Sequence, residues 1–165
     1  MSNIDSNYIV LAGGCFWGVE ELFRKQEGVT GTLVGYSGGD LDSPTYNDVK
    51  LGSTGHAEAI KISFDKSKTS LAELLRFFYK MHDPTTLNQQ GNDKGTQYRS
   101  AIFYKTEEQK QVAKEIIKEV ESSKKFSRPI TTSLETEKEF YPAEAYHQKY
   151  LEKNPNGYTC HFIRD

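Results

Sequence analysis

The residue types best suited to chemistry gather around Cys15, in the run Gly13-Gly14-Cys15-Phe16-Trp17-Gly18. An apolar run, residues 8–12, precedes the glycine pair, and apolar side chains then recur at helical spacing: Phe16, Val19, Leu22 and Phe23. Cys15 is therefore predicted to lie at a helix N-terminus, where free backbone N–H groups and the helix dipole favour a thiolate. Trp17, the only tryptophan, and Phe16 can wall an apolar pocket beside the sulfur. The alternative is a small buried cysteine among core aromatics.

A carboxyl group and a second thiol complete the candidate set. Residues 56–64 alternate as a strand, which aligns Glu58 with Ile60 and Ile62 on an apolar face. A carboxyl group there loses hydration, which raises its pKa and lets it hold a proton at neutral pH, although a strand-end glutamate that reaches water is the alternative. Cys160 follows a break at residues 154–157, on a tail expected to move more freely than a core segment.

These groups suit thiol redox chemistry, in which a thiolate attacks, an acid protonates the leaving oxygen and a second thiol resolves the oxidised first. A second class is a Cys-dependent hydrolase or transferase, which would pair Cys15 with a histidine base: His56, His147 or His161. A third class is a metal-binding or purely structural module. No spacing identifies a histidine base or a set of metal ligands, so the residues imply neither a metal nor a cofactor.

Length and composition exclude several other classes. A chain of 165 residues is long enough for one substantial core, and we expect a single domain over residues 1–165. The net charge of −2, with 21 basic and 23 acidic residues interspersed, predicts no electrostatic binding to nucleic acid or to an anionic membrane. No apolar run could span a bilayer and the first residues do not resemble a signal peptide, which predicts a cytoplasmic protein.

The periodicity of the chain predicts an α+β fold. We expect strands over residues 8–12, 30–34, 56–64, 100–104 and 129–135, with long loops over residues 35–55 and 83–97. Helices are expected from residue 16, from Leu71 behind the N-cap Ser70, and from residue 107 behind the N-cap Thr106. A shorter helix is expected to begin at Pro142 and to point three side chains inward: Tyr146, Tyr150 and Leu151. This order predicts a two-layer sandwich with a ferredoxin-like βαββαβ core, a mixed, mostly antiparallel sheet and an extended tail from about residue 154 to 165.

The motifs resemble those of the type A peptide methionine sulfoxide reductases. Gly14-Cys15-Phe16-Trp17-Gly18 resembles the nucleophile motif of that family, and Thr54-Gly55-His56-Ala57-Glu58 resembles its acid-bearing segment. Further segments match in the same order, namely the glycine turn at residues 35–39 and residues 82–85, 90–100 and 140–148. The resemblance therefore covers nearly the whole chain and is more specific than any single motif.

The resemblance implies that Cys15 attacks the sulfur of methionine S-sulfoxide while Glu58 protonates its oxygen. The other implied site residues form two groups: Tyr46, Tyr98 and Asp93 around that oxygen, and Phe16 and Trp17 around the methyl group. The reaction would leave a sulfenic acid on Cys15 and release methionine. It would act on methionine sulfoxide, free or in proteins, and so repair oxidised proteins.

Cys160 resembles the resolving cysteine of the family, whose disulfide with the nucleophile is reduced by thioredoxin. We expect a monomer without a cofactor, which binds neither nucleic acid nor a membrane. The sequence departs from the family pattern at Lys50, where a Cys is frequent, and at Ala145, where an acidic residue is usual. Since no further Cys follows Cys160, a three-thiol relay is not expected.

Overall fold

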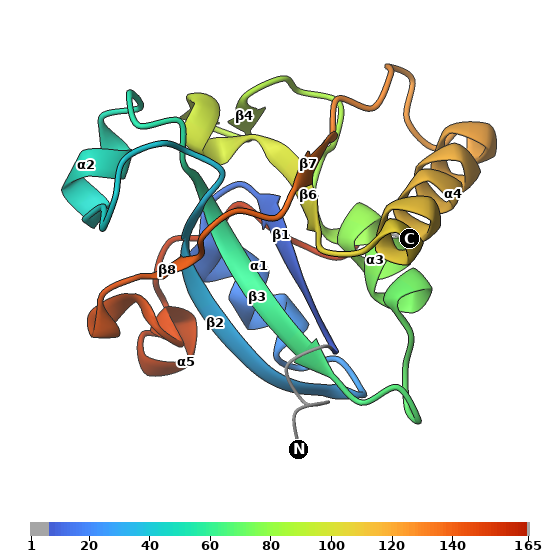
Figure 1. Cartoon of the computed structure of the whole chain (residues 1–165), viewed down its shortest axis with the longest axis horizontal. Coiled ribbons are helices and arrows are strands. Elements are labelled where there is room, and N and C mark those ends of the chain that lie inside the picture. Colours follow the sequence, from blue (N-terminus) through green and yellow to red (C-terminus); the bar gives the residue numbers. More distant parts are fainter. Residues whose placement is uncertain (1–6, 165) are drawn as a thin grey trace.

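A six-stranded sheet forms the centre of the computed structural model, which describes residues 7–164 (Figure 1). The strands run in the spatial order β7-β6-β1-β3-β2-β8, and every neighbouring pair is antiparallel except the parallel pair β6 and β7. Their bounds are β1 (Tyr8–Gly13), β2 (Val29–Ser37), β3 (Ala57–Phe64), β6 (Ser100–Tyr104), β7 (Ser133–Thr136) and β8 (Tyr141–Pro142). A separate two-stranded ribbon pairs β4 (Gln89–Gln90) with β5 (Asp93–Lys94). The predicted mixed, mostly antiparallel sheet is thus confirmed.

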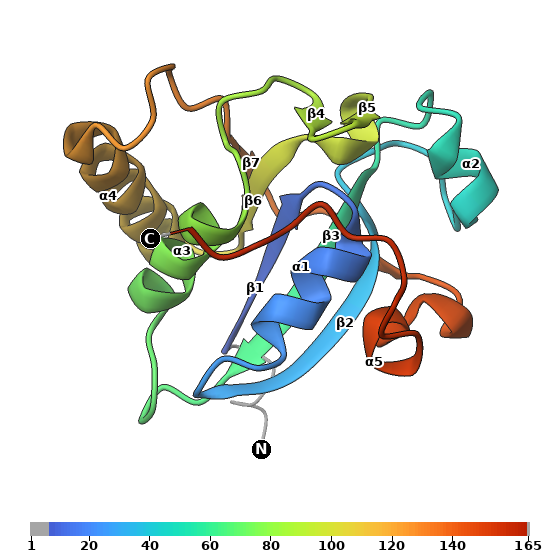
Figure 2. The same cartoon turned by 180° about the vertical axis from the view of Figure 1, so that it is seen from behind.

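Five α-helices surround the sheet in the described part of the chain. They are α1 (Phe16–Phe23), α2 (Tyr46–Lys50), α3 (Leu71–Met81), α4 (Glu107–Ser123) and α5 (Tyr150–Lys153). Two 3₁₀ helices, η2 (Thr96–Tyr98) and η3 (Ala145–His147), complete the set. Helices α1 and α3 cover the same face of the sheet, and α4 lies beside α3 (Figure 2). No helix within residues 7–164 is long and apolar enough to cross a membrane.

Strand β1 is buried on both faces, as its continuous apolar run predicts. Ile9 and Leu11 join the large core beneath α1 and α3. Val10 packs on the opposite face with Phe103, where Phe140 covers a smaller cluster. Because the strand is enclosed on both sides, the turn that follows it is held in a fixed position, and this turn carries Cys15.

The predicted N-caps of the two long helices are confirmed. The Ser70 hydroxyl accepts the Glu73 backbone N–H at 3.2 Å, and the Thr106 hydroxyl accepts the Gln109 backbone N–H at 3.1 Å. Such caps typically contribute about 1 kcal/mol each. The strand predicted over residues 129–135 is shorter than expected, since β7 spans only Ser133–Thr136.

The long loop predicted over residues 35–55 contains a helix that periodicity did not reveal. Thr45 caps α2 with a reciprocal pair of hydrogen bonds to Asp48, and the Glu144 carboxylate accepts the Tyr46 N–H at 2.9 Å. A helix of five residues is too short to show an apolar stripe or to be stable alone. A residue almost 100 positions away stabilises it by binding its first turn.

The prediction of a helix that begins at Pro142 is wrong. Pro142 belongs to β8 instead, and the Ala143 N–H donates to the Val34 carbonyl at 2.9 Å, so this backbone pairs with β2 and cannot start a helix. Tyr146, predicted to point inward, is 59% exposed, whereas Leu151 is buried as expected. The local pattern failed here because pairing with a distant strand overrode helix propensity.

Candidate active site

Cys15 occupies the predicted position, as the N-cap residue of α1 directly after β1. The chain reaches it through Gly14, whose φ of 101° is strained for residues with a side chain. A Cβ at Gly14 would also lie only 2.7 Å from the Gln90 side chain. The turn therefore requires glycine, and it holds Cys15 in a buried position, with only 8% of the residue exposed.

The thiolate expected at this helix start is not the resting form of Cys15. Burial raises the pKa of the thiol well above its ordinary value, and the Glu58 charge raises it further. The Trp17 backbone N–H, which hydrogen-bonds to the sulfur, lowers the pKa but does not offset burial. Cys15 is thus a protonated thiol at neutral pH, because loss of hydration outweighs the helix N-terminus.

Glu58 holds a proton at neutral pH, as its place on the apolar face of β3 predicts. Only 2% of the residue is exposed, and burial raises its pKa to about 8 despite the hydrogen bond that its Oε1 accepts from the Phe16 N–H at 3.1 Å. The Asp93 charge adds to the increase. Since Phe16 directly follows Cys15, this bond fixes a neutral carboxyl group at the base of the cysteine turn.

The two aromatic residues after Cys15 have different surroundings. Phe16 is 1% exposed and packs against Tyr36 and His147, with ring centroids 5.7 Å and 5.3 Å away. Trp17 is half-buried, stacks on Tyr150 with centroids 3.8 Å apart, and donates its Nε1–H to His147 Nδ1 at 2.9 Å. Phe16 therefore belongs to the buried core, and Trp17 forms the part of the aromatic wall that reaches the surface.

Tyr46, in the first turn of α2, and Tyr98, at the end of η2, lie within electrostatic reach of Glu58 and Cys15. Burial and then the Glu58 charge raise the pKa of Tyr46 to about 12, and the same causes raise the pKa of Tyr98 further. Neither hydroxyl has a hydrogen-bond partner within residues 7–164. Both are thus protonated donors that remain available to a ligand oxygen.

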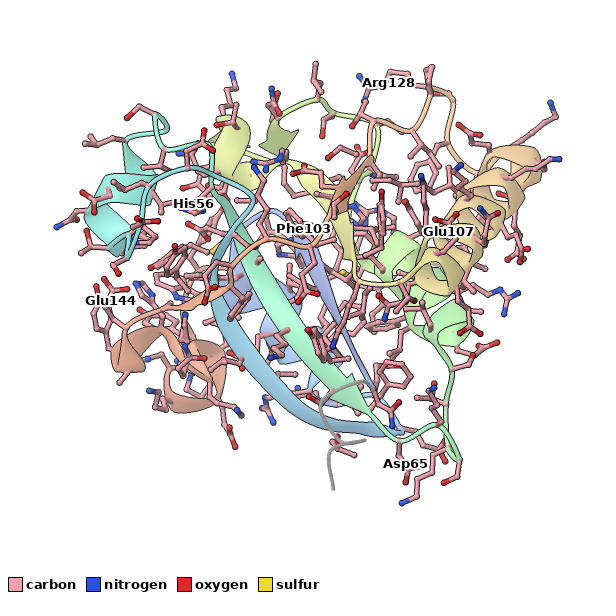
Figure 3. The ribbon with its side chains drawn as sticks, viewed as in Figure 1. His56, Asp65, Phe103, Glu107, Arg128 and Glu144 are labelled. Atoms are coloured by element: carbon pink, nitrogen blue, oxygen red, sulfur yellow. The ribbon has the colours of Figure 1, made fainter. Side chains whose placement is uncertain are left out.

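Glu144 holds Tyr46 in place from the opposite end of the sequence. One of its carboxylate oxygens accepts the Tyr36 hydroxyl at 2.8 Å and the other accepts the Tyr46 backbone N–H at 2.9 Å. Figure 3 shows Glu144 on the side of the molecule that carries α2. Through these bonds, a residue from the C-terminal third of the chain holds the backbone that carries the Tyr46 ring.

Cys160 and Asp93 meet beside the ribbon of β4 and β5. The Cys160 Sγ lies 3.8 Å from the Gln90 carbonyl oxygen and 3.9 Å from Asp93 Oδ2, and the Tyr158 hydroxyl donates to the same Asp93 oxygen at 3.2 Å. Both cysteines are free. Asp93 therefore contacts the tail, whereas Tyr46 and Tyr98 interact with it only through its charge.

The tail is docked on the rest of the protein, whereas the sequence predicted a tail that moves more freely than a core segment. It crosses the N-terminal end of α1 and continues toward α3, where the Arg164 N–H donates to the Lys80 carbonyl (Figure 2). His161 is 7% exposed, and its Nε2 lies 2.7 Å from the Gly13 carbonyl oxygen. Because this contact binds the tail to the turn before Cys15, the structure differs from the mobile tail predicted from the break at residues 154–157.

The histidines do not form the alternative sites considered from the sequence. His147 accepts from Trp17, His161 donates to Gly13, and His56 contacts the Gly39 N–H and the Leu41 carbonyl. Within the described residues, no histidine nitrogen is hydrogen-bonded to Cys15. In the same part of the chain, no group of three or more His, Cys, Asp or Glu side chains is arranged to hold a metal ion.

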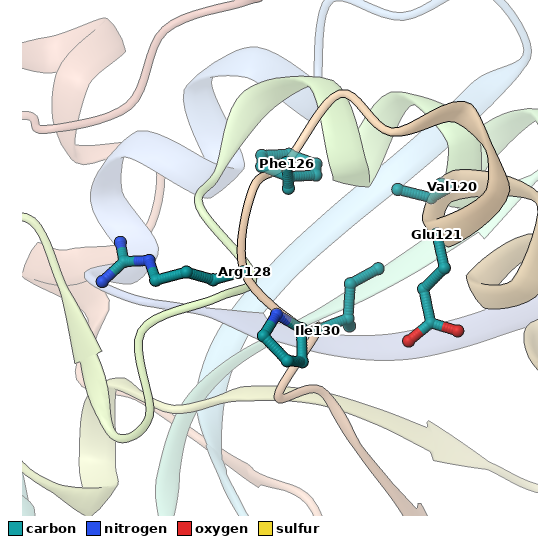
Figure 4. Close-up of a pocket in the computed structure, with 6 residues that line it drawn as sticks. Val120, Glu121, Phe126, Arg128 and Ile130 are labelled. Atoms are coloured by element: carbon teal, nitrogen blue, oxygen red, sulfur yellow. The ribbon is translucent and has the colours of Figure 1, made fainter.

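A cavity of about 180 Å³ lies elsewhere, between the end of α4 and the segment that follows it (Figure 4). It is lined by Val120, Glu121, Phe126, Arg128, Pro129 and Ile130. None of the predicted site residues lines it, so this cavity is separate from the cysteine site.

Comparison with known proteins identifies the family. Residues 7–165 match the family model described as peptide methionine sulfoxide reductase. The chain belongs to this family. A relative from Mycolicibacterium gilvum, named peptide methionine sulfoxide reductase MsrA, is 51% identical over 160 residues, which are 97% of this chain and 92% of the relative.

Solved structures of similar proteins have the same fold. Reduced Mxr1 from Saccharomyces cerevisiae is 42% identical and superposes with a TM-score of 0.91, over 96% of this chain and 92% of that one. Mxr1 in complex with Trx2 superposes less closely, with a TM-score of 0.65 and 27% identity over 96% of this chain and 89% of that one. The fold of Mxr1 is thus present over nearly all of the chain.

Several contacts of this candidate site were not predicted from the sequence. Glu144, which holds Tyr46, and His147, which accepts from Trp17, both lie in the segment at residues 140–148 that carries part of the resemblance. His161 directly follows Cys160, but nothing in the local sequence indicates that it is buried. Its neighbours in space, Gly13 and Gly18, lie directly before and at the end of the nucleophile motif, so only the folded chain reveals this contact.

Proposed function

We propose that Cys15 is the nucleophile and Glu58 the acid of a reductase that converts the S epimer of methionine sulfoxide, free or in proteins, to methionine. The observation that carries this proposal is the buried pair itself. A protonated carboxyl group of pKa about 8 is hydrogen-bonded to the residue that follows the cysteine. A sulfoxide oxygen must gain a proton as it leaves sulfur, and a neutral carboxyl group is a suitable donor at neutral pH.

The first step moves one oxygen atom between two sulfurs. The Cys15 sulfur attacks the sulfoxide sulfur while the Glu58 proton moves to the oxygen, and the thiol proton restores Glu58. The hydroxyl group then passes to Cys15 as the bond between the two sulfurs breaks. The products are a sulfenic acid on Cys15 and methionine, so the cysteine is oxidised by the two electrons that reduce the sulfoxide.

The neighbouring side chains orient the substrate in this proposal. The free hydroxyls of Tyr46 and Tyr98 donate to the sulfoxide oxygen and stabilise its developing charge. Trp17 and Phe16 form the side that receives the methyl group, and the charge of Asp93 helps to keep Glu58 protonated. Such an arrangement would favour one sulfoxide epimer, because oxygen and methyl group must point in fixed directions.

The second half of the cycle restores the thiol. Cys160 attacks the sulfenic acid, which forms a Cys15–Cys160 disulfide and releases water, and thioredoxin then reduces the disulfide. The complex of the yeast relative Mxr1 with Trx2 supports thioredoxin as the reductant. His161, which directly follows Cys160, lies 2.7 Å from the carbonyl oxygen of Gly13, two residues before Cys15, so the tail that carries Cys160 docks at the nucleophile turn.

The same proposal covers the organisation of the protein. The order β6-β1-β3-β2, with α1 and α3 on one face, supports a ferredoxin-like βαββαβ core in a single catalytic domain over residues 1–165. We also propose a monomer, because every group in the mechanism comes from one chain. Two free cysteines suit the reducing cytoplasm.

Separate incubation with the S and R epimers of methionine sulfoxide tests the activity directly. With a dithiol as reductant, we expect methionine from the S epimer and little from the R epimer, since the wrong configuration exchanges the oxygen and methyl positions. Mass spectrometry of the products measures both. Equal conversion of the two epimers would contradict the proposed orientation, and no conversion of either would contradict the activity.

Replacing Cys160 with serine tests the recycling step. We expect one equivalent of methionine per protein, accumulation of a sulfenic acid on Cys15, and loss of turnover with thioredoxin, because no other thiol in the chain can resolve it. Small thiols should restore part of the turnover. Peptide mapping of the unmodified protein after one equivalent of substrate should show the Cys15–Cys160 disulfide. Undiminished turnover of the variant with thioredoxin would show that Cys160 is not the resolving thiol.

A further inference from the structure

His161 is held against the turn that carries the nucleophile. Its Nε2 lies 2.7 Å from the carbonyl oxygen of Gly13, and only 7% of the residue is exposed. A carbonyl oxygen can only accept, so Nε2 carries the proton and Nδ1 is left with a lone pair. Nδ1 lies 3.9 Å from the Cys160 sulfur. One nitrogen of the imidazole ring therefore contacts the turn before Cys15, and the other faces Cys160.

Two glycines of the nucleophile motif make room for this ring. A Cβ at Gly18 would collide with the His161 ring and with the Thr159 hydroxyl, and a Cβ at Gly14 would lie 3.2 Å from His161 Nε2. The Thr159 hydroxyl in turn accepts the His161 backbone N–H at 3.1 Å. The surface of α1 and the turn before it are therefore shaped to receive the tail.

The contact fixes the position of Cys160. On the far side of the tail, the Cys160 side chain packs over Gly91, with Sγ 3.5 Å from the place of a Cβ there. The tail is thus held between the ribbon of β4 and β5 on one side and α1 on the other. Farther along the tail, the Arg164 backbone N–H donates to the Lys80 carbonyl.

We propose that His161 is the positioning residue of the resolving step, which holds Cys160 beside the nucleophile turn before Cys15 is oxidised. This inference rests on the proposed role of Cys160. A thiol on a loose tail meets the sulfenic acid only as often as chain diffusion allows, whereas a docked thiol has a much higher effective concentration. In this proposal His161 acts through the position of Cys160, whose sulfur lies 3.9 Å from its Nδ1.

The test compares His161→Ala with the matched control Ile163→Ala, which changes an exposed residue of the same tail. After mixing with one equivalent of substrate, quenched samples report methionine, sulfenic acid trapped by dimedone, and the Cys15–Cys160 disulfide. We expect disulfide formation to slow roughly 5- to 100-fold in His161→Ala, as loss of a buried hydrogen bond commonly causes, with little change in Ile163→Ala. His161→Gln, whose amide can donate to the Gly13 carbonyl, should recover part of the rate.

A second variant removes the docking contact without changing His161. Gly18→Ala should favour α1, because alanine has a higher intrinsic helix propensity than glycine. The added Cβ would collide with the tail. We therefore expect slow disulfide formation in a protein that is no less stable. Alkylation of Cys160 by a maleimide in the resting protein should become faster in both variants. This readout requires no substrate and reports the docked state directly.

Failure of this inference differs from failure of the proposed function. Normal disulfide formation and unchanged alkylation of Cys160 in both variants would overturn the role of His161, while the function would stand. A wild-type protein that forms methionine but no disulfide would instead overturn the role of Cys160. If His161→Ala does not fold, Gly18→Ala and His161→Gln decide the outcome.

Discussion

Replacing Cys15 with serine will stop the reduction of methionine sulfoxide at its first step. A serine hydroxyl is a far weaker nucleophile toward sulfur than a thiol and cannot form a sulfenic acid, so no other path to methionine remains. Removal of the nucleophile in covalent enzymes can lower the rate by roughly 10⁶-fold, and we expect at least about a 10⁴-fold loss here. The measurement is methionine formed in a single turnover, with protein in excess over substrate.

The structure makes Cys15→Ser a clean test. The residue is an N-cap, a position that serine favours, so the helix start should be kept and the melting temperature should change little. Cys160→Ser is the matched control, because it removes the other sulfur and should still give the first equivalent of methionine. Methionine formed by Cys15→Ser at the rate of the control would eliminate Cys15 as the nucleophile.

Replacing Glu58 with glutamine will slow the same step while the fold is preserved. The amide oxygen can still accept the Phe16 N–H, but the amide cannot transfer a proton to the sulfoxide oxygen. General acid catalysis typically contributes roughly 10²- to 10⁴-fold, and we expect a loss in this range. In the unmodified protein, the single-turnover rate should fall above about pH 8, where Glu58 loses its proton. The variant should lack this dependence.

Glu58→Gln should also stabilise the protein at alkaline pH. The folded-state pKa of Glu58, about 8, lies above the ordinary 4.5, so the folded protein holds a proton that the unfolded chain releases between these values. The contribution of protonated Glu58 to the free energy of unfolding is therefore fully present below pH 4.5 and is lost as the pH rises to about 8. At about 1.4 kcal/mol per pKa unit, the full loss is about 5 kcal/mol. Glutamine carries no charge and avoids this loss.

Denaturant unfolding of both proteins from pH 5 to pH 9 measures this effect. The gain in the free energy of unfolding should be close to zero at pH 5 and largest above pH 8. A gain that does not depend on pH would show that Glu58 is not protonated in the folded protein. An unchanged single-turnover rate would show that the acid is a different group, with Asp93 as the next candidate.

Stability and activity oppose each other at this residue. A carboxyl group that is only 2% exposed destabilises the folded protein at high pH, and the same burial keeps it protonated and able to act as an acid at neutral pH. Removing the carboxyl group would thus produce a more stable protein and a slower reductase.

The sequence by itself determined the parts of the site that depend on neighbouring residues. A continuous apolar run ended by a glycine pair specifies β1 and its turn, and helical spacing after it puts Cys15 at the start of α1. The alternation of residues 56–64 aligns Glu58 with Ile60 and Ile62 on an apolar face, so its raised pKa could be predicted as well. These features need only the period of the backbone and the character of adjacent side chains.

Only the tertiary structure decided the features that depend on residues far apart in the chain. The thiol is protonated because burial outweighs the helix N-terminus, and Glu144 stabilises α2 by binding its first turn. The tail is docked because His161 reaches the Gly13 carbonyl, a contact between residues 148 positions apart. No local period describes such contacts, since hydration lost on burial and hydrogen bonds across the fold exist only when the whole chain has folded.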